Sequence, residues 1–153
     1  MSYKYRKGKR TLKKRRKENK TDYKARLNML KSGKLRMVVR LTNKYIILQA
    51  VESYESKDKV IAGITSKHLL DYGWQEGSLK NKKACYLTGY LLSKKLKGKE
   101  LILDIGMAVS HPKGRLYAAV KGLIDGGVKI NVNKEMLPEI EDDKIKEKID
   151  KNG

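Results

Sequence analysis

Apolar and polar residues alternate most regularly in the segment 35–41. Every second residue there is Leu, Met or Val, and Arg36 and Arg40 lie between them. This period of two predicts a strand with one buried face. Thr42-Asn43 then predicts a tight turn, because asparagine tolerates the left-handed conformation that a hairpin requires. The pattern predicts a three-strand antiparallel meander, with strands at 35–41, 45–51 and 60–65 and a polar loop at 53–59.

Spacings of three and four residues, typical of amphipathic helices, recur in the other parts of the chain. The clearest helix is predicted over 81–97, with Gly98 as its end, and a second over 113–125, before Gly126-Gly127. A shorter helix is predicted to start at Thr21 as its N-cap and to stop at Gly33. Its stripe is Tyr23, Leu27 and Leu30, and Arg26 lies off that stripe, toward solvent or a ligand.

Two further strands and a final helix complete the prediction. Residues 101–106 are almost continuously apolar, which favours a strand covered on both faces in a parallel pairing. A short strand is predicted over 128–132, and a terminal helix from Pro138 whose thin apolar stripe predicts weak docking. The predicted fold class is therefore α/β: a mixed sheet, with an antiparallel meander plus a parallel strand, packed with helices.

Charge changes this picture at the N-terminal end. The 153 residues carry a net charge of +20, and residues 1–40 alone hold 17 Lys or Arg and 2 acids. Eleven of the first 20 residues are basic, so this segment is predicted to stay disordered until phosphates neutralise it. We expect three parts: a basic RNA-binding arm at 1–20, a globular domain at 21–135, and a C-terminal helix or tail at 136–153.

Other chemistry is sparse. Cys85 is the only cysteine, which excludes a disulfide within the chain, and its place in a helical pattern predicts a small buried residue. His68 and His111 have no nearby ligand set, and 73–77 lacks the ending of a phosphate-binding loop. We predict no metal, cofactor or small-molecule substrate. The absence of a secretory signal and of a long apolar run predicts a cytoplasmic protein without a membrane partner.

Several sequence blocks together resemble a known family. They read TDY and LKSGK in 21–34, RMVVRLTNKY in 36–45, DYGW in 71–74, ACYLTGYL in 84–91, LDIG in 103–106, and GRLYAAVKG followed by DGG in 114–127. In this order they are similar to the archaeal-type large-subunit ribosomal protein eighteen, of the universal 5S rRNA-binding family. The resemblance runs from about residue 21 to 140, over most of the chain.

The resemblance implies a structural constituent of the large ribosomal subunit. The family binds 5S rRNA and anchors it to the central protuberance, with large-subunit rRNA and other ribosomal proteins as neighbours. Its fold is similar to the ribonuclease H-like topology, and its basic arm extends into RNA. Matched positions imply RNA contacts at Arg36, Arg40, Asn43, Lys44, Tyr45 and Arg115. Charge adds Arg6, Lys7, Arg10, Lys13, Arg15, Arg16, Arg26 and Lys113, and Tyr23 lies among these charges, where it could stack on a base. For Tyr23, a place in the core of the first helix is an equal alternative.

Two other classes of protein stay open as alternatives. One is a basic RNA-binding protein outside the ribosome, or a membrane-surface or chromatin protein, although an interfacial helix and DNA-binding motifs are missing. The other is a metal-dependent nuclease of ribonuclease H-like topology. Such an enzyme gathers several carboxylates, whereas the first strand here has none and the central strand has only Asp104. We therefore predict no enzyme and interpret Asp104 as a structural acid that pairs with a basic residue.

Overall fold

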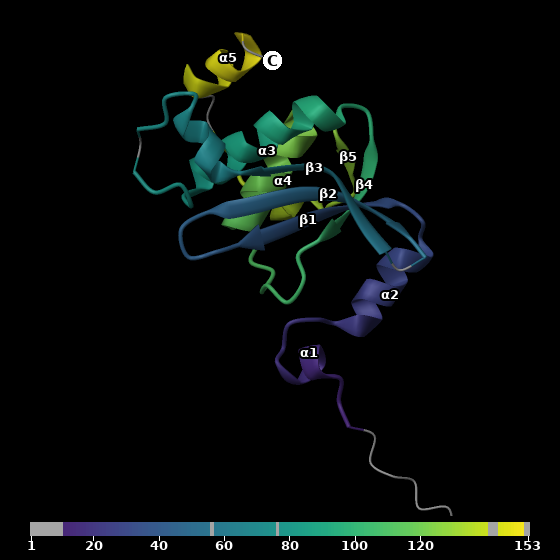
Figure 1. Cartoon of the computed structure of the whole chain (residues 1–153). Coiled ribbons are helices and arrows are strands. Elements are labelled where there is room, and N and C mark those ends of the chain that lie inside the picture. Colours follow the sequence, from purple (N-terminus) through teal and green to yellow (C-terminus); the bar gives the residue numbers. More distant parts are fainter. Residues whose placement is uncertain (1–10, 56, 76, 141–143, 152–153) are drawn as a thin grey trace, which may run out of the picture.

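The computed structural model describes residues 11–55, 57–75, 77–140 and 144–151. Within them one mixed sheet forms in the strand order β3-β2-β1-β4-β5 (Figure 1). Its strands are β1 (Leu35–Leu41), β2 (Ile46–Tyr54), β3 (Lys57–Thr65), β4 (Glu100–Asp104) and β5 (Lys129–Ile130). β1, β2 and β3 are an antiparallel meander, and β4 runs parallel to β1. The predicted fold class is confirmed.

The meander is longer than its sequence pattern predicted. The polar loop expected at 53–59 is wrong: β2 continues to Tyr54, β3 begins at Lys57, and these two residues pair across a short turn. Polar residues are accommodated in strands here because the end of the hairpin is exposed. There Ser53 also donates a hydrogen bond to the carboxylate of Asp58, its cross-strand neighbour.

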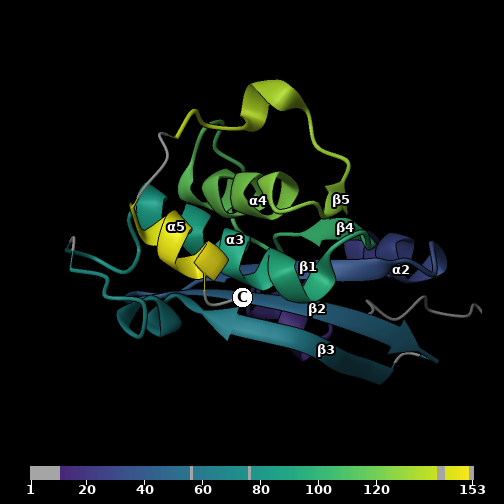
Figure 2. The same ribbon diagram turned by 90° about the horizontal axis from the view of Figure 1, so that it is seen from above.

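Helices α3 (Lys82–Leu96) and α4 (Arg115–Asp125) cover one face of the sheet (Figure 2). Both were predicted within two residues of these bounds, and Asn81 caps α3 by accepting from the backbone N–H of Ala84. The core lies between these helices and the apolar face of the meander. Its fully buried members include Met37, Val39, Leu48, Ala50, Leu87, Leu92, Ala119 and Leu123.

The two helices approach each other at glycines. A Cβ atom added at Gly89 in α3 would collide with the carbonyl oxygen of Ala119, and one added at Gly122 in α4 would collide with that of Tyr86. The backbones of α3 and α4 therefore touch, and only residues without a side chain fit at this crossing. This tight packing fixes the helical layer against the sheet.

The N-terminal elements lie away from this layer. Helix α2 (Tyr23–Lys31) is capped by Asp22, which accepts from the backbone N–H groups of Lys24 and Ala25, so the expected cap at Thr21 is displaced by one residue. Its predicted stripe is not buried, since Leu27 is 52% exposed. Helix α1 (Lys14–Lys17) is one exposed turn inside the segment predicted to be disordered, and residues 1–10 lie outside the described ones.

The C-terminal prediction was wrong about where the helix begins. Pro138 does not start a helix: residues 138–140 have no regular structure, since proline is tolerated in a first helical turn but does not by itself induce one. The 3₁₀ turn η2 (Lys134–Met136) precedes this proline, and helix α5 spans Lys144–Lys151. A second 3₁₀ turn, η1 (Ser66–Leu70), follows β3. One face of α5 is anchored, since Ile149 is fully buried and Tyr90 donates a hydrogen bond to Asp150.

Candidate nucleic-acid interface

The sheet face opposite α3 and α4 carries a chain of ion pairs that connects four elements. Arg36 of β1 lies between two carboxylates, with Nη2 2.8 Å from Asp58 of β3 and Nη1 3.0 Å from Asp104 of β4. Arg26 of α2 binds the second oxygen of Asp58 at 2.8 Å. Arg40 binds the second oxygen of Asp104 at 2.9 Å. We call the sequence Arg26–Asp58–Arg36–Asp104–Arg40 the ionic chain.

The ionic chain alternates positive and negative groups around a buried centre. Arg36 is only 2% exposed, so its charge depends on its two carboxylate partners. Burial of Asp58 works to raise the pKa of this carboxyl, but hydrogen bonds from Ser53, Arg26 and Arg36 hold the pKa below its ordinary value. The prediction that Asp104 is a structural acid paired with basic residues is confirmed.

The burial of Arg36 differs from the expectation of an RNA-facing side chain. The alternation in β1 places Arg36 and Arg40 on the open face as predicted, but Arg36 is buried there among partners from three other strands: Ser53 of β2, Asp58 of β3 and Asp104 of β4. Arg40 lies at the edge of this cover, and its side chain is 42% exposed. Of the two arginines in β1, Arg40 is therefore the accessible one.

The guanidinium of Arg40 is held rigidly. Its Nη1 donates to the backbone carbonyls of Val39 at 2.9 Å and Asp104 at 2.7 Å. Gly106 lies directly against it: an added Cβ there would lie 2.9 Å from Cζ, 3.0 Å from Nη2 and 3.2 Å from Nε of Arg40. These distances are nearly equal, so Gly106 faces the flat side of the guanidinium. A side chain at 106 would displace it.

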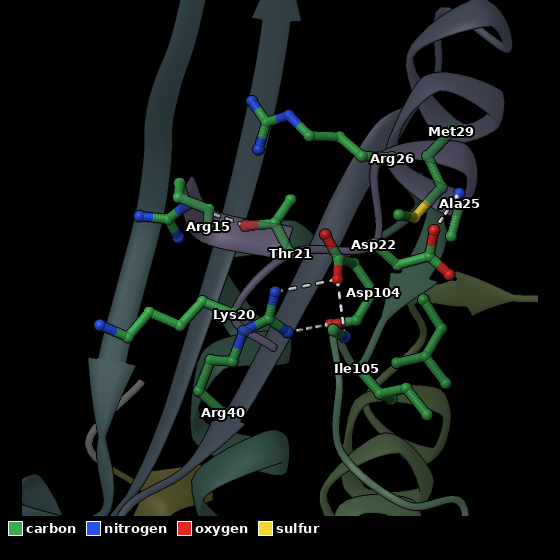
Figure 3. A pocket seen from close by; sticks show the side chains of 12 residues that line it. Arg15, Lys20, Thr21, Asp22, Ala25, Arg26, Met29, Arg40, Asp104 and Ile105 are labelled. Atoms are coloured by element: carbon green, nitrogen blue, oxygen red, sulfur yellow. Dashed lines mark hydrogen bonds and ion pairs between the residues drawn. The ribbon is translucent and has the colours of Figure 1, made fainter. Parts of the chain in front are cut away.

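Arg40 and Gly106 border a hollow between the N-terminal segment and the sheet (Figure 3). The hollow has a volume of about 260 Å³. Its wall combines apolar and charged side chains, among them Arg15, Lys20, Arg26, Met29 and Ile105. Because α1, α2, β1 and the end of β4 all contribute, the hollow exists only in the folded chain.

The arm candidates that the structure describes lie before α2, and one of them, Arg15, lines the hollow. Lys13, Arg15 and Arg16 are exposed, and Arg15 donates a hydrogen bond from Nε to the hydroxyl of Thr21 at 2.9 Å. Tyr23 is half-buried and does not belong to the hydrophobic core, and the Lys13 ammonium lies 4.6 Å from its ring centroid. These contacts disfavour the core alternative for Tyr23. Three further arm candidates, Arg6, Lys7 and Arg10, lie outside the described residues.

The other candidates lie at two separate sites on the surface, the turn between β1 and β2 and the start of α4. Asn43 and Lys44 are exposed in the turn between β1 and β2, and Tyr45 beside them is half-buried, with Lys67 over its ring. Lys113 and Arg115 are exposed before and at the start of α4. The structure thus brings Arg15, Arg26 and Arg40 together around the hollow, and leaves the hairpin turn and the start of α4 as additional basic sites.

No cluster of acids, histidines and cysteine that could hold a metal ion is found among the residues the structure describes. Asp104, the acid of the central strand, is engaged by Arg36 and Arg40. The arrangement offers basic groups for phosphates, but the described residues do not gather the cluster of carboxylates that two-metal nucleases use. In the described part of the chain, no helix is long and apolar enough to cross a bilayer.

Cys85 is buried in α3, as predicted. Burial raises the pKa of its thiol to about 12, so the reactive thiolate is not formed near neutral pH. This supports the interpretation of Cys85 as a packing residue.

Sequence reasoning missed two residues of the site. Asp58 lies in a stretch that was interpreted as a loop, and only the pairing of β2 with β3 brings it to Arg36. Gly106 was noted as part of a motif, but not as the support of Arg40. The sequence signal for Asp58 is that it is the one acid in the polar stretch 57–59. It would have predicted an ion pair with a basic residue only if the third strand had been predicted to begin at 57.

Comparison with known proteins gives a consistent family. A family model for the ribosomal large-subunit proteins 60S L5 and 50S L18 matches residues 7–101, well over half of the chain. A protein of Korarchaeum cryptofilum named large ribosomal subunit protein uL18 is 50% identical over 128 residues, which are 82% of this chain and 65% of the relative.

Other relatives with the same name agree. Identity is 43% over 129 residues with the protein of Methanosphaera stadtmanae, covering 82% of this chain and 66% of the relative. Identity is 42% over 130 residues with the protein of Methanoculleus marisnigri, covering 83% of this chain and 74% of the relative. The chain spans slightly less than two thirds of the length of the first two relatives.

Proposed function

The chain belongs to the family of ribosomal large-subunit proteins 60S L5 and 50S L18, and on this premise we propose that it is a structural RNA-binding component of the large subunit. Its specific partner is 5S rRNA, which it anchors to the central protuberance. Large-subunit rRNA and neighbouring ribosomal proteins are further partners, and the site of action is the cytoplasmic ribosome.

The observation that carries the proposal is the position of the family match. Residues 7–101 include the basic segment, α2, β1 and the hairpin turn, which together hold most of the candidate RNA contacts. Structured RNA is recognised mainly through its shape, phosphates and 2′-hydroxyls, and unpaired bases stack where they are splayed out. The exposed basic residues around the hollow and at the hairpin turn suit this kind of recognition.

We assign the folded domain and the arm different roles. The arm supplies sequence-independent attraction to phosphates, which falls steeply with salt. The open face of the sheet supplies a rigid surface, because the ionic chain fixes Arg40 and α2 on it. Arg40, the hairpin turn and Arg115 are therefore the residues through which the domain distinguishes 5S rRNA from other RNA.

The test is a gel shift with the purified chain on 5S rRNA and on a tRNA, between about 50 and about 200 mM salt. We expect a preference for 5S rRNA that persists at the higher salt. Equal binding to both RNAs, lost together as salt rises, would contradict the proposal. That result would favour the alternative of a basic RNA-binding protein with no specific ribosomal partner.

A further inference from the structure

We propose that the hollow between the N-terminal segment and the sheet binds a single unstacked nucleobase, which stacks on the guanidinium of Arg40. The inference deepens the proposed function and rests on it for the source of the base, a nucleotide of the bound RNA. It goes beyond phosphate neutralisation, because it assigns one named side chain to a base and not to the backbone.

The first argument is the rigidity and orientation of Arg40. Two backbone carbonyls and the Asp104 carboxylate accept from its Nη atoms at 2.7–2.9 Å, which fixes the plane of the group. One flat side lies against Gly106, and the side chain is still 42% exposed. The second flat side is therefore the accessible one. A guanidinium plane with one free side is a stacking surface for aromatic rings.

The second argument is the size and lining of the hollow. Its volume of about 260 Å³ is below the roughly 300–1,000 Å³ of pockets for drug-sized ligands, which suits one base. Ala25, Met29 and Ile105 contribute the apolar part of the wall (Figure 3). Thr21 and Lys20 contribute polar groups that can meet the edge of a base. A splayed-out base needs this combination of a flat partner, apolar contact and polar groups.

The third argument separates a base from a phosphate. Asp104 and Asp22 also line the hollow, and Asp104 directly neutralises Arg40. Of the four basic side chains that line the hollow, three already have a carboxylate partner: Lys20 pairs with Glu18, Arg26 with Asp58 and Arg40 with Asp104. Their charges are therefore largely neutralised within the chain, which favours a neutral base over a phosphate. The exposed lysines and arginines outside the hollow are better placed for phosphates because they do not share its carboxylates.

The first experiment titrates the full chain with the four nucleoside monophosphates and, as the matched control, with ribose 5-phosphate, and follows the backbone amide of Gly106 by NMR. At least one monophosphate should shift this amide, and ribose 5-phosphate, which lacks only the base, should not. Arg40→Lys should abolish the shift, because lysine keeps the charge and loses the plane. Equal shifts from ribose 5-phosphate, or no shift from any monophosphate, would overturn the inference.

The second experiment measures affinity for 5S rRNA. Arg40→Lys should weaken binding about tenfold to a hundredfold while the dependence on salt stays unchanged, as expected for loss of one stacked base. Arg16→Ala, the charge control at an exposed residue that does not line the hollow, should instead reduce the dependence on salt. Wild-type affinity in Arg40→Lys would contradict the stacking role. Failure of the proposed function differs from this, since the wild-type chain would then not prefer 5S rRNA over tRNA.

Discussion

At the scale of single residues, Arg36 is the centre of the ionic chain on the open face of the sheet. Its guanidinium is almost fully buried and neutralised from two sides by Asp58 and Asp104. A buried ion pair of this kind adds little net stability compared with an apolar core, but removal of one partner leaves an uncompensated charge. Arg36 is in this sense a structural residue. Arg40 lies four residues further along β1 and is more exposed, so it is the one available to RNA.

Arg36→Ala should lower the free energy of unfolding by about 1–3 kcal/mol, because Asp58 and Asp104 would lose their shared partner and keep only Arg26 and Arg40. Urea denaturation at neutral pH measures this change. Arg115→Ala is the matched control, since Arg115 is exposed and its loss should change the stability by no more than about 0.5 kcal/mol. A stable Arg36→Ala protein with reduced RNA affinity would instead support the original prediction of a direct RNA contact.

Asp58 makes part of this stability dependent on pH. Hydrogen bonds from Ser53, Arg26 and Arg36 outweigh the opposing effect of burial and keep the pKa of Asp58 below its ordinary value. The folded chain therefore binds this proton more weakly than the unfolded chain. The resulting stability is present above the unfolded pKa of about 4 and is lost as pH falls through the lower, folded value.

Asp58→Asn tests this dependence. The difference in unfolding free energy between the wild type and Asp58→Asn should be largest near neutral pH and should shrink as the pH falls below about 4. Denaturation curves at pH values on both sides of this range measure the difference. A difference that is the same at every pH would mean that the carboxylate charge of Asp58 contributes nothing to the fold.

At the scale of elements, the reliable predictions came from patterns that a segment carries by itself. The alternation in 35–41 identified β1 and its two faces, and the continuous apolar run after residue 100 identified β4 as a parallel strand. The errors arose where distant partners decide. Lys57 and Asp58 belong to a strand because β2 pairs with them, and the start of α5 is not marked by Pro138. The hollow was likewise not predictable, since four elements form it.

The crossing of α3 and α4 depends on two glycines that the helical patterns did not single out. Gly122→Ala should destabilise the chain by about 2–3 kcal/mol or more, because the new Cβ would push against the backbone oxygen of Tyr86 and separate the helices. Thermal denaturation followed by circular dichroism measures the loss. Gly63→Ala is the control: a Cβ there meets its neighbours at ordinary distances of 3.4 Å or more and should change stability by less than about 1 kcal/mol.

At the scale of the whole molecule, charge and shape are divided between two parts. Residues 1–40 carry a net charge of +15 and the rest of the chain only +5. The basic segment leads into α2 beside the open face of the sheet, while α3 and α4 occupy the other face (Figures 1 and 2). This division of charge suits the proposed function: the basic segment can attract RNA from a distance, and the fixed sheet face beside it can then select the RNA.

Deletion of residues 1–20 separates these two contributions. If about eight contacts to phosphates form in the full chain, the logarithm of the binding constant should fall with the logarithm of salt with a slope of about −6, and the deletion should reduce this slope to about half. The melting temperature should change little, because residues 11–20 are exposed and contribute nothing to the core. Affinity for 5S rRNA should fall most at low salt, while the preference over tRNA should persist because Arg40 and the hairpin turn remain. If the deletion also abolished the preference for 5S rRNA over tRNA, recognition would lie in residues 1–20. The folded domain would then contribute no selectivity of its own.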